Sequence, residues 1–446
     1  MALLALAGCA DGVRPPTPRA ARLGTGSVSQ LPPLQPDDPR PARGFLLPAP
    51  LFEVEGEEVR LQALLDGELG QDLGLRWTAR GGTLVADGSD DRARLRPTSP
   101  DWEVRVDLMR RGRELATAVA QAPLHPTVDL AAMLQARAEA VPLDAEACGD
   151  PRFPARVASG HVGCSGGEPI LLDRFLPLDA DSDVPMPGLP QRPGQKEPTQ
   201  VRPGDAAVEA GLLGWTGDAL GTWRGPEGGT IAWLPQGALR GPPALGPERL
   251  AVLRSDRVEV SMAGSNQRTL LPAQPLDAPG AAAVHSPWLA VLEGDPGRAR
   301  LRLQDLDRNR QTWVGDPADR SDLHVDSRWL TWREGDDVCW LDLERGELRR
   351  RTLGAVRGRP SERLDDLLLV PVRAPGGVAL DALHLPTGQH GTLLAAAGDL
   401  RLRGAVAGAV TVAQGPFGGR ASLLALTLPA APEPTPAPHP SPPAAP

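Results

Sequence analysis

Ser165 is the residue whose neighbours best match an activated nucleophile. Residues 163–167 read Gly-Cys-Ser-Gly-Gly, which fits the pattern G-x-S-x-G. A serine in that pattern reacts only on a sharp strand-to-helix turn, because backbone strain there lifts its hydroxyl towards a general base. The residues that follow, 168–173, read as a strand. The pattern therefore predicts a glycine hairpin, and we assign no catalytic residue.

Three aspartates, Asp179, Asp181 and Asp183, have the alternating spacing with which a calcium loop begins. Such a loop needs Gly at its sixth position and Glu at its twelfth, where this chain has Val184 and Pro190. We expect an exposed acidic turn here, with the three aspartates only weak candidates for a cation. The histidines are scattered, and no C-x-x-C spacing is present, so we expect no metal site and no cofactor.

Two cysteines, Cys148 and Cys164, bracket a short loop that contains Gly and Pro. In an oxidising compartment they could form a disulfide, which would add ~3 kcal/mol in the chain-entropy model. Their spacing in sequence does not establish that they approach in space, so the pairing stays open. Cys339 stands between Val338 and Trp340 in an apolar strand, and we expect it to be a buried packing residue.

The N-terminus carries a pattern that predicts a location. An Ala/Leu-rich run ends in Leu6-Ala7-Gly8-Cys9, which resembles the lipobox of bacterial lipoproteins. In that family the cysteine is lipidated and becomes the first residue of the mature protein. The run here is short and has no preceding Lys or Arg, which departs from the family. The resemblance implies a signal over residues 1–9, lipidation of Cys9, and a cell-envelope protein held at the periplasmic face or the outer membrane.

Composition narrows the class of protein further. The chain has 446 residues with 50 Gly and 50 Pro, which disfavours a helical bundle and favours many short strands. No apolar run reaches the ~20 residues of a membrane-spanning helix. The net charge is −9 and the arginines are scattered, so we expect no nucleic-acid partner. Proline-rich composition predicts a tether over residues 10–44 and a disordered tail over 429–446.

Residues 45–124 alternate between apolar and polar side chains, as the strands of an antiparallel sandwich do. Trp77, the Gly-Gly-Thr-Leu of residues 81–84, and the pair Val104 and Val106 resemble the layout of bacterial Ig-like domains of the PKD type. The resemblance implies an Ig-like β-sandwich, a module that mostly serves as a spacer or an adhesion unit. Residues 125–145 then read as a connector, with a short helix in the Leu/Ala-rich stretch 129–140.

A repeat of about forty residues dominates the rest of the chain. Residues 250–256, 289–295 and 330–336 each contain an apolar strand and a turn that ends in Asp, and a second strand follows each of them. Weaker copies complete a series whose first residues are Val162, Leu213, Leu250, Leu289, Leu330, Leu368 and Val410. The first interval is longer because a proline-rich insertion, residues 185–204, lies within it.

Seven such copies predict a β-propeller over residues 146–428, because small sheets packed radially bury faces that one sheet alone leaves exposed. The copies resemble degenerate WD40-like and TolB-like propellers of bacterial envelope proteins, although the Gly-His and Trp-Asp marks of true WD40 repeats are absent. Six or eight blades and an array of sandwiches remain alternatives. The predicted fold class is all-β, an Ig-like sandwich followed by a seven-bladed propeller.

Four aspartates, Asp218, Asp256, Asp295 and Asp336, recur at the same turn of successive units. In a propeller these turns share one face, so the four form a hypothetical acidic binding rim. The simpler interpretation is that Asp is a good turn former.

Taken together, the patterns favour a lipid-anchored envelope protein whose propeller is a binding platform for a protein or an envelope polymer. Two alternatives stay open. One is a propeller enzyme, a hydrolase or lyase acting on glycans or peptides. The other is a purely structural surface protein.

Overall fold

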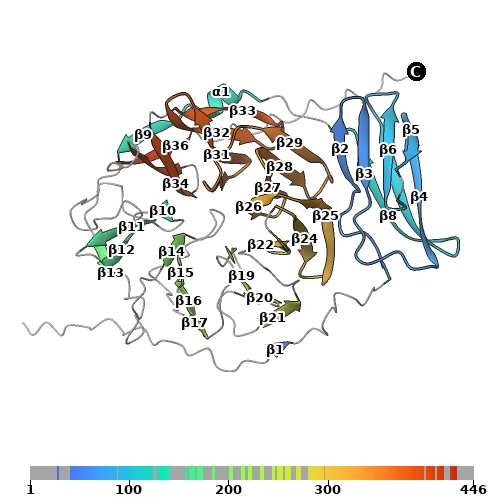
Figure 1. Cartoon of the computed structure of the whole chain (residues 1–446), viewed down its shortest axis with the longest axis horizontal. Coiled ribbons are helices and arrows are strands. Elements are labelled where there is room, and N and C mark those ends of the chain that lie inside the picture. The colour runs from blue at the N-terminus through green and yellow to red at the C-terminus, as the bar shows by residue number, and fades with distance from the viewer. Residues whose placement is uncertain are drawn as a thin grey trace, which may run out of the picture.

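The computed structural model describes residues 28–29, 41–87, 89–123 and 128–140, the strands of 156–272 with a few flanking residues, and 280–428 except 296, 396–397, 407–408 and 416–421. Nearly all of its elements are strands, and they form a ring of small sheets with a sandwich beside it (Figure 1). The expected all-β class is confirmed.

The sandwich consists of seven strands in two sheets. These are β2 (Leu51–Glu55), β3 (Glu58–Gln62), β4 (Leu73–Arg80), β5 (Gly82–Ala86), β6 (Arg92–Pro97), β7 (Glu103–Arg110) and β8 (Arg113–Gln121). One sheet has the order β2-β3-β6-β5 and the other β4-β7-β8, the strand order of constant-type immunoglobulin domains. Trp77, on β4, packs against both apolar clusters between the sheets, and Phe52 meets Trp102 edge to face at 5.3 Å. The expected Ig-like sandwich is therefore present.

Seven further sheets are the blades of a propeller. Each contains four antiparallel strands, and β1 (Val28–Ser29) adds a fifth, parallel strand to blade 3. Blade 1 contains β10 (Arg156–Val157), β11 (Gly160–Ser165), β12 (Glu168–Asp173) and β13 (Asp183–Pro185). Blade 2 contains β14 (Gln200–Pro203), β15 (Leu212–Trp215), β16 (Ala219–Trp223) and β17 (Ala232–Pro235). Blade 3 contains β18 (Ala244–Leu245), β19 (Arg249–Leu253), β20 (Arg257–Met262) and β21 (Arg268–Pro272).

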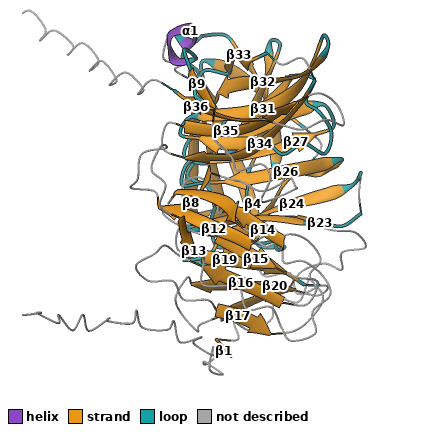
Figure 2. Cartoon of the chain, turned by 90° about the vertical axis from the view of Figure 1, so that its left-hand side faces the viewer, coloured by secondary structure: helices purple, strands orange, loops and turns teal. Residues whose placement is uncertain are grey.

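Blade 4 contains β22 (Ala281–His285), β23 (Trp288–Glu293), β24 (Ala299–Asp305) and β25 (Arg310–Ala318). Blade 5 contains β26 (Arg320–Val325), β27 (Trp329–Glu334), β28 (Asp337–Asp342) and β29 (Leu348–Thr352). Blade 6 contains β30 (Glu362–Leu364), β31 (Leu367–Ala374), β32 (Gly377–His384) and β33 (Gln389–Leu394). Figure 2 shows the sheets from the side of the ring. In blades 1 to 6 these four strands run from the centre outwards in sequence order.

Blade 7 is closed by a strand from far upstream. It contains β34 (Asp399–Val406), β35 (Ala409–Gly415) and β36 (Ser422–Thr427), and its outermost strand is β9 (Arg137–Ala140). β9 pairs antiparallel with β36, with Ala425 opposite Glu139. The ring therefore begins at Arg137, within the segment expected to be a connector, and not at residue 146. Sharing one blade between both ends of the propeller joins those ends by backbone hydrogen bonds.

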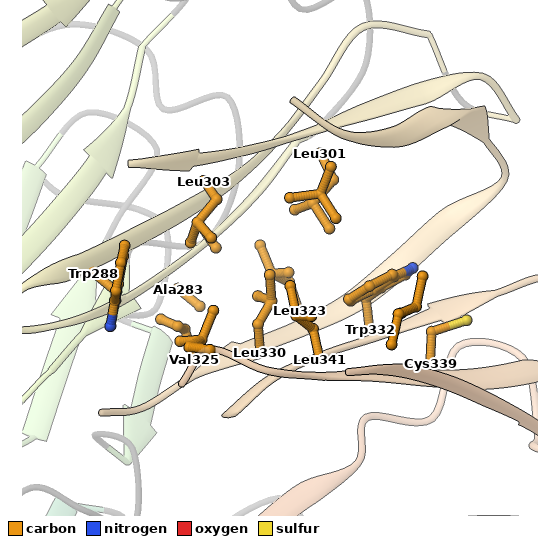
Figure 3. Packing of buried hydrophobic residues seen from close by; sticks show 14 of the residues in the cluster. Ala283, Trp288, Leu301, Leu303, Leu323, Val325, Leu330, Trp332, Cys339 and Leu341 are labelled. Carbon is orange, nitrogen blue, oxygen red and sulfur yellow. The ribbon is translucent and has the colours of Figure 1, made fainter. Parts of the chain in front are cut away.

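All seven residues that start the sequence repeat lie on the second strand of their blades, namely β11, β15, β19, β23, β27, β31 and β35. These strands are flanked on both sides within their sheets, and β23 is buried along its whole length. Side chains from neighbouring blades meet between the sheets, where Leu303 and Leu330 are fully buried in one cluster (Figure 3). The count of seven blades is confirmed.

The third and fourth strands of two blades meet at a capped turn that is itself repeated. Asp305 and Asp342 end β24 and β28, and each begins an Asp-Leu-acidic-Arg sequence. In each turn the aspartate Oδ1 accepts the backbone N–H groups two and three residues later, at 2.9–3.0 Å. This side-chain cap fixes the turn.

N-terminal segments cover several outer edges of the ring. Helix α1 (Leu130–Met133), capped by Asp129, packs its leucines on the cluster of blades 6 and 7. It lies against β33, where Gly391 leaves room for Leu134. The helix is shorter than the expected stretch 129–140, whose last residues form β9 instead. In the predicted tether, β1 (Val28–Ser29) pairs in parallel with β21 on the rim of blade 3.

Candidate functional site

The sandwich is docked on the rim of blades 4 and 5, where β2 lies beside β29. Leu46, Leu47, Leu51 and Leu64 belong to the same buried cluster as the facing strands of those blades. Burying four leucines excludes water from the junction and stabilises it by ~1.5–3 kcal/mol per side chain. The two domains therefore pack as one body through a continuous apolar core.

A backbone contact sets the position of the sandwich. The N–H of Phe52 donates to the carbonyl oxygen of Gly346, in the turn before β29, at 2.8 Å. Gly346 has φ of +72°, and a Cβ placed there would lie 2.3 Å from the carbonyl oxygen of Pro50. Only glycine fits both the backbone conformation and the close approach.

Beside this junction lies a cleft of about 450 Å³ between the outer face of β2, β3 and β6 and the rim of blades 4 and 5. Its sandwich wall includes Glu53, Arg60, Gln62, Asp87, Arg92 and Arg94. Its propeller wall includes Asp316, Arg320, Trp332, Glu334 and Arg350. The cleft is the candidate functional site, because it is concave and charged, and its walls come from two domains.

Two ion pairs cross the cleft from wall to wall. Arg350 lies 2.5 Å from the carboxylate of Glu53, and Arg92 lies 2.7 Å from that of Asp316. Donation of a hydrogen bond to Glu53 raises the pKa of Arg350, and donation to Asp316 raises the pKa of Arg92. In return, Arg92 lowers the pKa of Asp316. The two pairs tie the walls of the cleft together.

Arg320 is a buried residue of the propeller wall of the cleft. Its Nε is 3.2 Å from the carboxylate of Glu334, and its Nη1 donates to the carbonyl oxygen of Val314. The centre of its guanidinium lies over Trp332, 5.8 Å from the centroid of the ring. Gly315, at φ of +62°, would bring a Cβ within 2.9 Å of this guanidinium. The irregular end of β25, where the pairing with β24 shifts register, thus makes room for the arginine.

Two of the four predicted rim aspartates can be placed. Asp295 and Asp336 are both exposed, in the turns between the second and third strands of blades 4 and 5. In a propeller, equivalent turns of neighbouring blades share one face of the ring, and the acidic binding rim stays a hypothesis. The turn at Asp336 adjoins the cleft, because Gly335 N–H donates to the carbonyl of Asp319 and Glu334 lines the cleft. Asp218 and Asp256 lie outside the described residues.

Most other predicted residues also lie outside the described part of the chain, namely Cys9, Cys148, Asp179 and Asp181. For Cys164 and Asp183 the structure gives only the strands that carry them, β11 and β13, so the disulfide and the cation remain predictions. β11 and β12 form a hairpin with Ser165 opposite Glu168, which confirms that the glycine pattern is a hairpin. Cys339 is buried as expected.

A Ser-His-Asp cluster that the sequence did not suggest lies between the inner strands of blades 5 and 6. His324 Nε2 is 3.3 Å from both Asp322 Oδ1 and Ser361 Oγ, and Ser361 N–H donates to Asp322. Burial opposes ionisation of Asp322, yet its contacts with His324 and Arg333 keep its pKa low. A proton relay needs the acid and the serine on opposite ring nitrogens. This buried cluster instead joins two blades.

Among the described residues, no three His, Cys, Asp or Glu side chains are grouped as metal ligands would be. No helix in that part of the chain is long and apolar enough to cross a membrane.

No protein-family model matches the chain, and no curated protein is similar in sequence. The CNH domain of AfRom2 is 10% identical over 66% of this chain and 99% of its own, with a TM-score of 0.40. A TolB protein from Agrobacterium tumefaciens is 11% identical over 44% and 80%, with a TM-score of 0.34. A prolyl endopeptidase structure is 14% identical over 66% and 48%, with a TM-score of 0.41.

The strand pairing and the packing described above define the class. This is a two-domain all-β protein in which an Ig-like sandwich is docked on the outer rim of a closed seven-bladed propeller.

Proposed function

We propose that the protein is a non-catalytic binding platform of the bacterial cell envelope, attached to a membrane by a lipid at Cys9. The sequence supports the anchor through its lipobox-like start and the proline-rich segment behind it. On this proposal the sandwich is a PKD-like spacer and the propeller a TolB-like or WD40-like module. The partner is a protein or a polymer of the envelope.

One observation carries the platform proposal. Asp295 and Asp336 are exposed at equivalent turns of adjacent blades, and the second turn adjoins a cleft whose walls are held together by apolar packing and ion pairs. A surface fixed in this way loses little conformational entropy when a partner binds. The turn face and the cleft together form the proposed recognition surface.

Affinity capture from envelope fractions tests the proposal, with the full chain as bait. We expect a specific component to bind, and Asp336→Lys to lose it. Glu344→Lys is the matched control, because Glu344 is exposed on the same blade at the turn between β28 and β29, on the opposite face of the ring. Equal capture by both variants would refute the proposed surface, and capture of nothing specific would favour a structural role. Loss of membrane association in Cys9→Ala tests the anchor.

A further inference from the structure

Strand register concentrates arginines on the outer face of the β2-β3-β6-β5 sheet, and three of them, Arg60, Arg92 and Arg94, line the cleft. Arg92, Arg94 and Arg96 alternate along β6, and Arg60 stands directly opposite Arg94 on β3. We call these four residues the arginine ladder. Alternate residues of a strand are about 6.6 Å apart, so β6 presents three guanidiniums in a regular row. Like charges directly opposite each other destabilise a sheet, so the Arg60–Arg94 pair lowers the stability of the sandwich. Residues that are unfavourable for the fold are expected at functional sites.

The charge that the cleft presents to solvent is positive. The side chains of Arg60, Arg94 and Arg350 are 54%, 42% and 44% exposed. Three of the carboxylates that line the cleft are withdrawn, with Glu53 at 10% and both Asp87 and Glu334 at 24%. Asp316, at 74%, is the exposed acid of the lining. Apart from Asp316, the carboxylates of the lining are therefore less exposed than these three guanidiniums, which an anion in the cleft can reach.

The present partners of Arg60 and Arg96 are exchangeable, whereas Arg94 pairs with the partly buried Asp87 at 2.7 Å and Arg92 with Asp316 across the cleft. Arg60 pairs with Glu55 at 2.8 Å, and Arg96 with Glu58 at 2.8 Å, both at the surface. Exposed pairs of this kind contribute only about 0–1 kcal/mol. A ligand anion can take the place of the carboxylate at little cost, because a guanidinium binds carboxylate and phosphate groups through the same two-pronged geometry.

We propose that the cleft and the arginine ladder bind an acidic polysaccharide, a linear chain that carries carboxylate or phosphate groups. The proposal rests on the proposed platform function and names the ligand of the cleft, which is separate from the partner that the acidic turns at Asp295 and Asp336 contact. The row along β6 suits repeated charges, and Gln62 adds a polar group for hydroxyls. Trp332, the aromatic residue of the lining, is 2% exposed, so the cleft offers no ring on which nucleic-acid bases could stack.

The negative net charge of the whole chain disfavours non-specific binding of polyanions. At −9 the protein repels polyanions in general, so binding of one requires a local positive site. Because exposed arginines drive it, the binding should weaken as the salt concentration rises.

Titration calorimetry of the full chain tests the proposal with four probes: polygalacturonate, dextran phosphate, neutral dextran and a single-stranded oligonucleotide. We expect one or both acidic polymers to bind, and their comparison tells carboxylate from phosphate recognition. Arg60→Gln/Arg94→Gln should weaken binding by roughly tenfold or more. Arg80→Gln/Arg113→Gln removes two exposed arginines from the other sheet and should leave affinity within about twofold.

The Arg60→Gln/Arg94→Gln variant removes a like-charge pair, so it should keep the thermal unfolding midpoint of the wild type. Arg96→Gln is a second variant, and it should also weaken binding of the acidic polymers. The proposal is overturned if neither acidic polymer binds, if both double variants lose affinity equally, or if the oligonucleotide binds as tightly. Capture that depends on Asp336 but not on the ladder would retain the platform and reject the polysaccharide.

Discussion

The guanidinium of Arg350, on the outer strand of blade 5, lies 2.5 Å from the carboxylate of Glu53 on the first strand of the sandwich. Glu53 is buried, whereas Arg350 is half exposed. We expect Glu53→Ala to lower the free energy of unfolding by ~1–2 kcal/mol, because the arginine loses its acceptor but can rehydrate. Urea denaturation measures this. Glu57→Ala, exposed in the turn between β2 and β3, should stay within ~0.5 kcal/mol, and equal losses would contradict the docking.

Gly346 offers a stricter test of the same junction. Gly346→Ala combines positive φ with a Cβ 2.3 Å from the carbonyl oxygen of Pro50, so the turn before β29 or the segment before β2 must shift. Gly354→Ala is the matched control, because Gly354 has φ of +67° and nothing within 4 Å of its Cβ. The control should lose ~1–2 kcal/mol from backbone strain alone. Thermal unfolding should show a clearly larger loss for Gly346→Ala; similar losses would mean that the close approach is absent.

Cys339 reports on the packing beneath the sandwich. It belongs to the buried cluster that includes Leu51, and burial raises the pKa of its thiol to about 12. At pH 8 only about one thiol in 10,000 is then ionised, so maleimide labelling of the native chain should be slow and should accelerate in urea. Peptide mass spectrometry identifies the labelled cysteine. Equal rates in native and denaturing buffer would show that the junction is open.

The pH dependence of the sandwich should depend on Asp107. Burial disfavours its charge, but hydrogen bonds from Arg105, Arg76 and Thr117 lower the pKa of Asp107 below its ordinary value. A lowered pKa stabilises the fold above the unfolded value of about 4, and this contribution disappears as pH falls through the folded value. Asp107→Asn should therefore cost ~1–2 kcal/mol at pH 7 and little near pH 2.

Urea denaturation at several pH values gives the comparison for Asp107. The exposed Asp101→Asn should run parallel to the wild type throughout. An Asp107→Asn deficit that stays constant from pH 7 to pH 2 would show that the carboxylate charge plays no part.

The sequence predicted the blades because each repeats one buried strand and one turn. Leu289 and Leu330 stand at corresponding positions of β23 and β27, and the pattern around them is local. The closing strand was not predictable in this way. Arg137–Ala140 is composed of Arg, Ala and Glu, which favour a helix, and its strand conformation depends on pairing with β36 at the far end of the chain.

The cleft could not be predicted from the sequence either, because the residues that form it are far apart in the chain. Glu53 and Arg350 are 297 residues apart, and Arg92 and Asp316 are 224 apart. Each looks like an ordinary surface charge until the domains are packed together. The acidic turns were visible because they recur within the repeat, and the ladder on β6 was visible only as alternation between arginine and apolar residues.

Ring closure is the claim on which the blades, their shared turn face and the cleft depend, and a cross-link measures it most directly. Glu139 and Ala425 are opposite each other in β9 and β36, at the 4.5–5.5 Å typical of paired strands, which suits a disulfide. Glu139→Cys/Ala425→Cys should form that disulfide in the folded protein, seen by peptide mass spectrometry. Glu139→Cys/Ser422→Cys, three positions out of register, should not. Absence of the first cross-link, or equal yield of both, would contradict a closed seven-bladed ring.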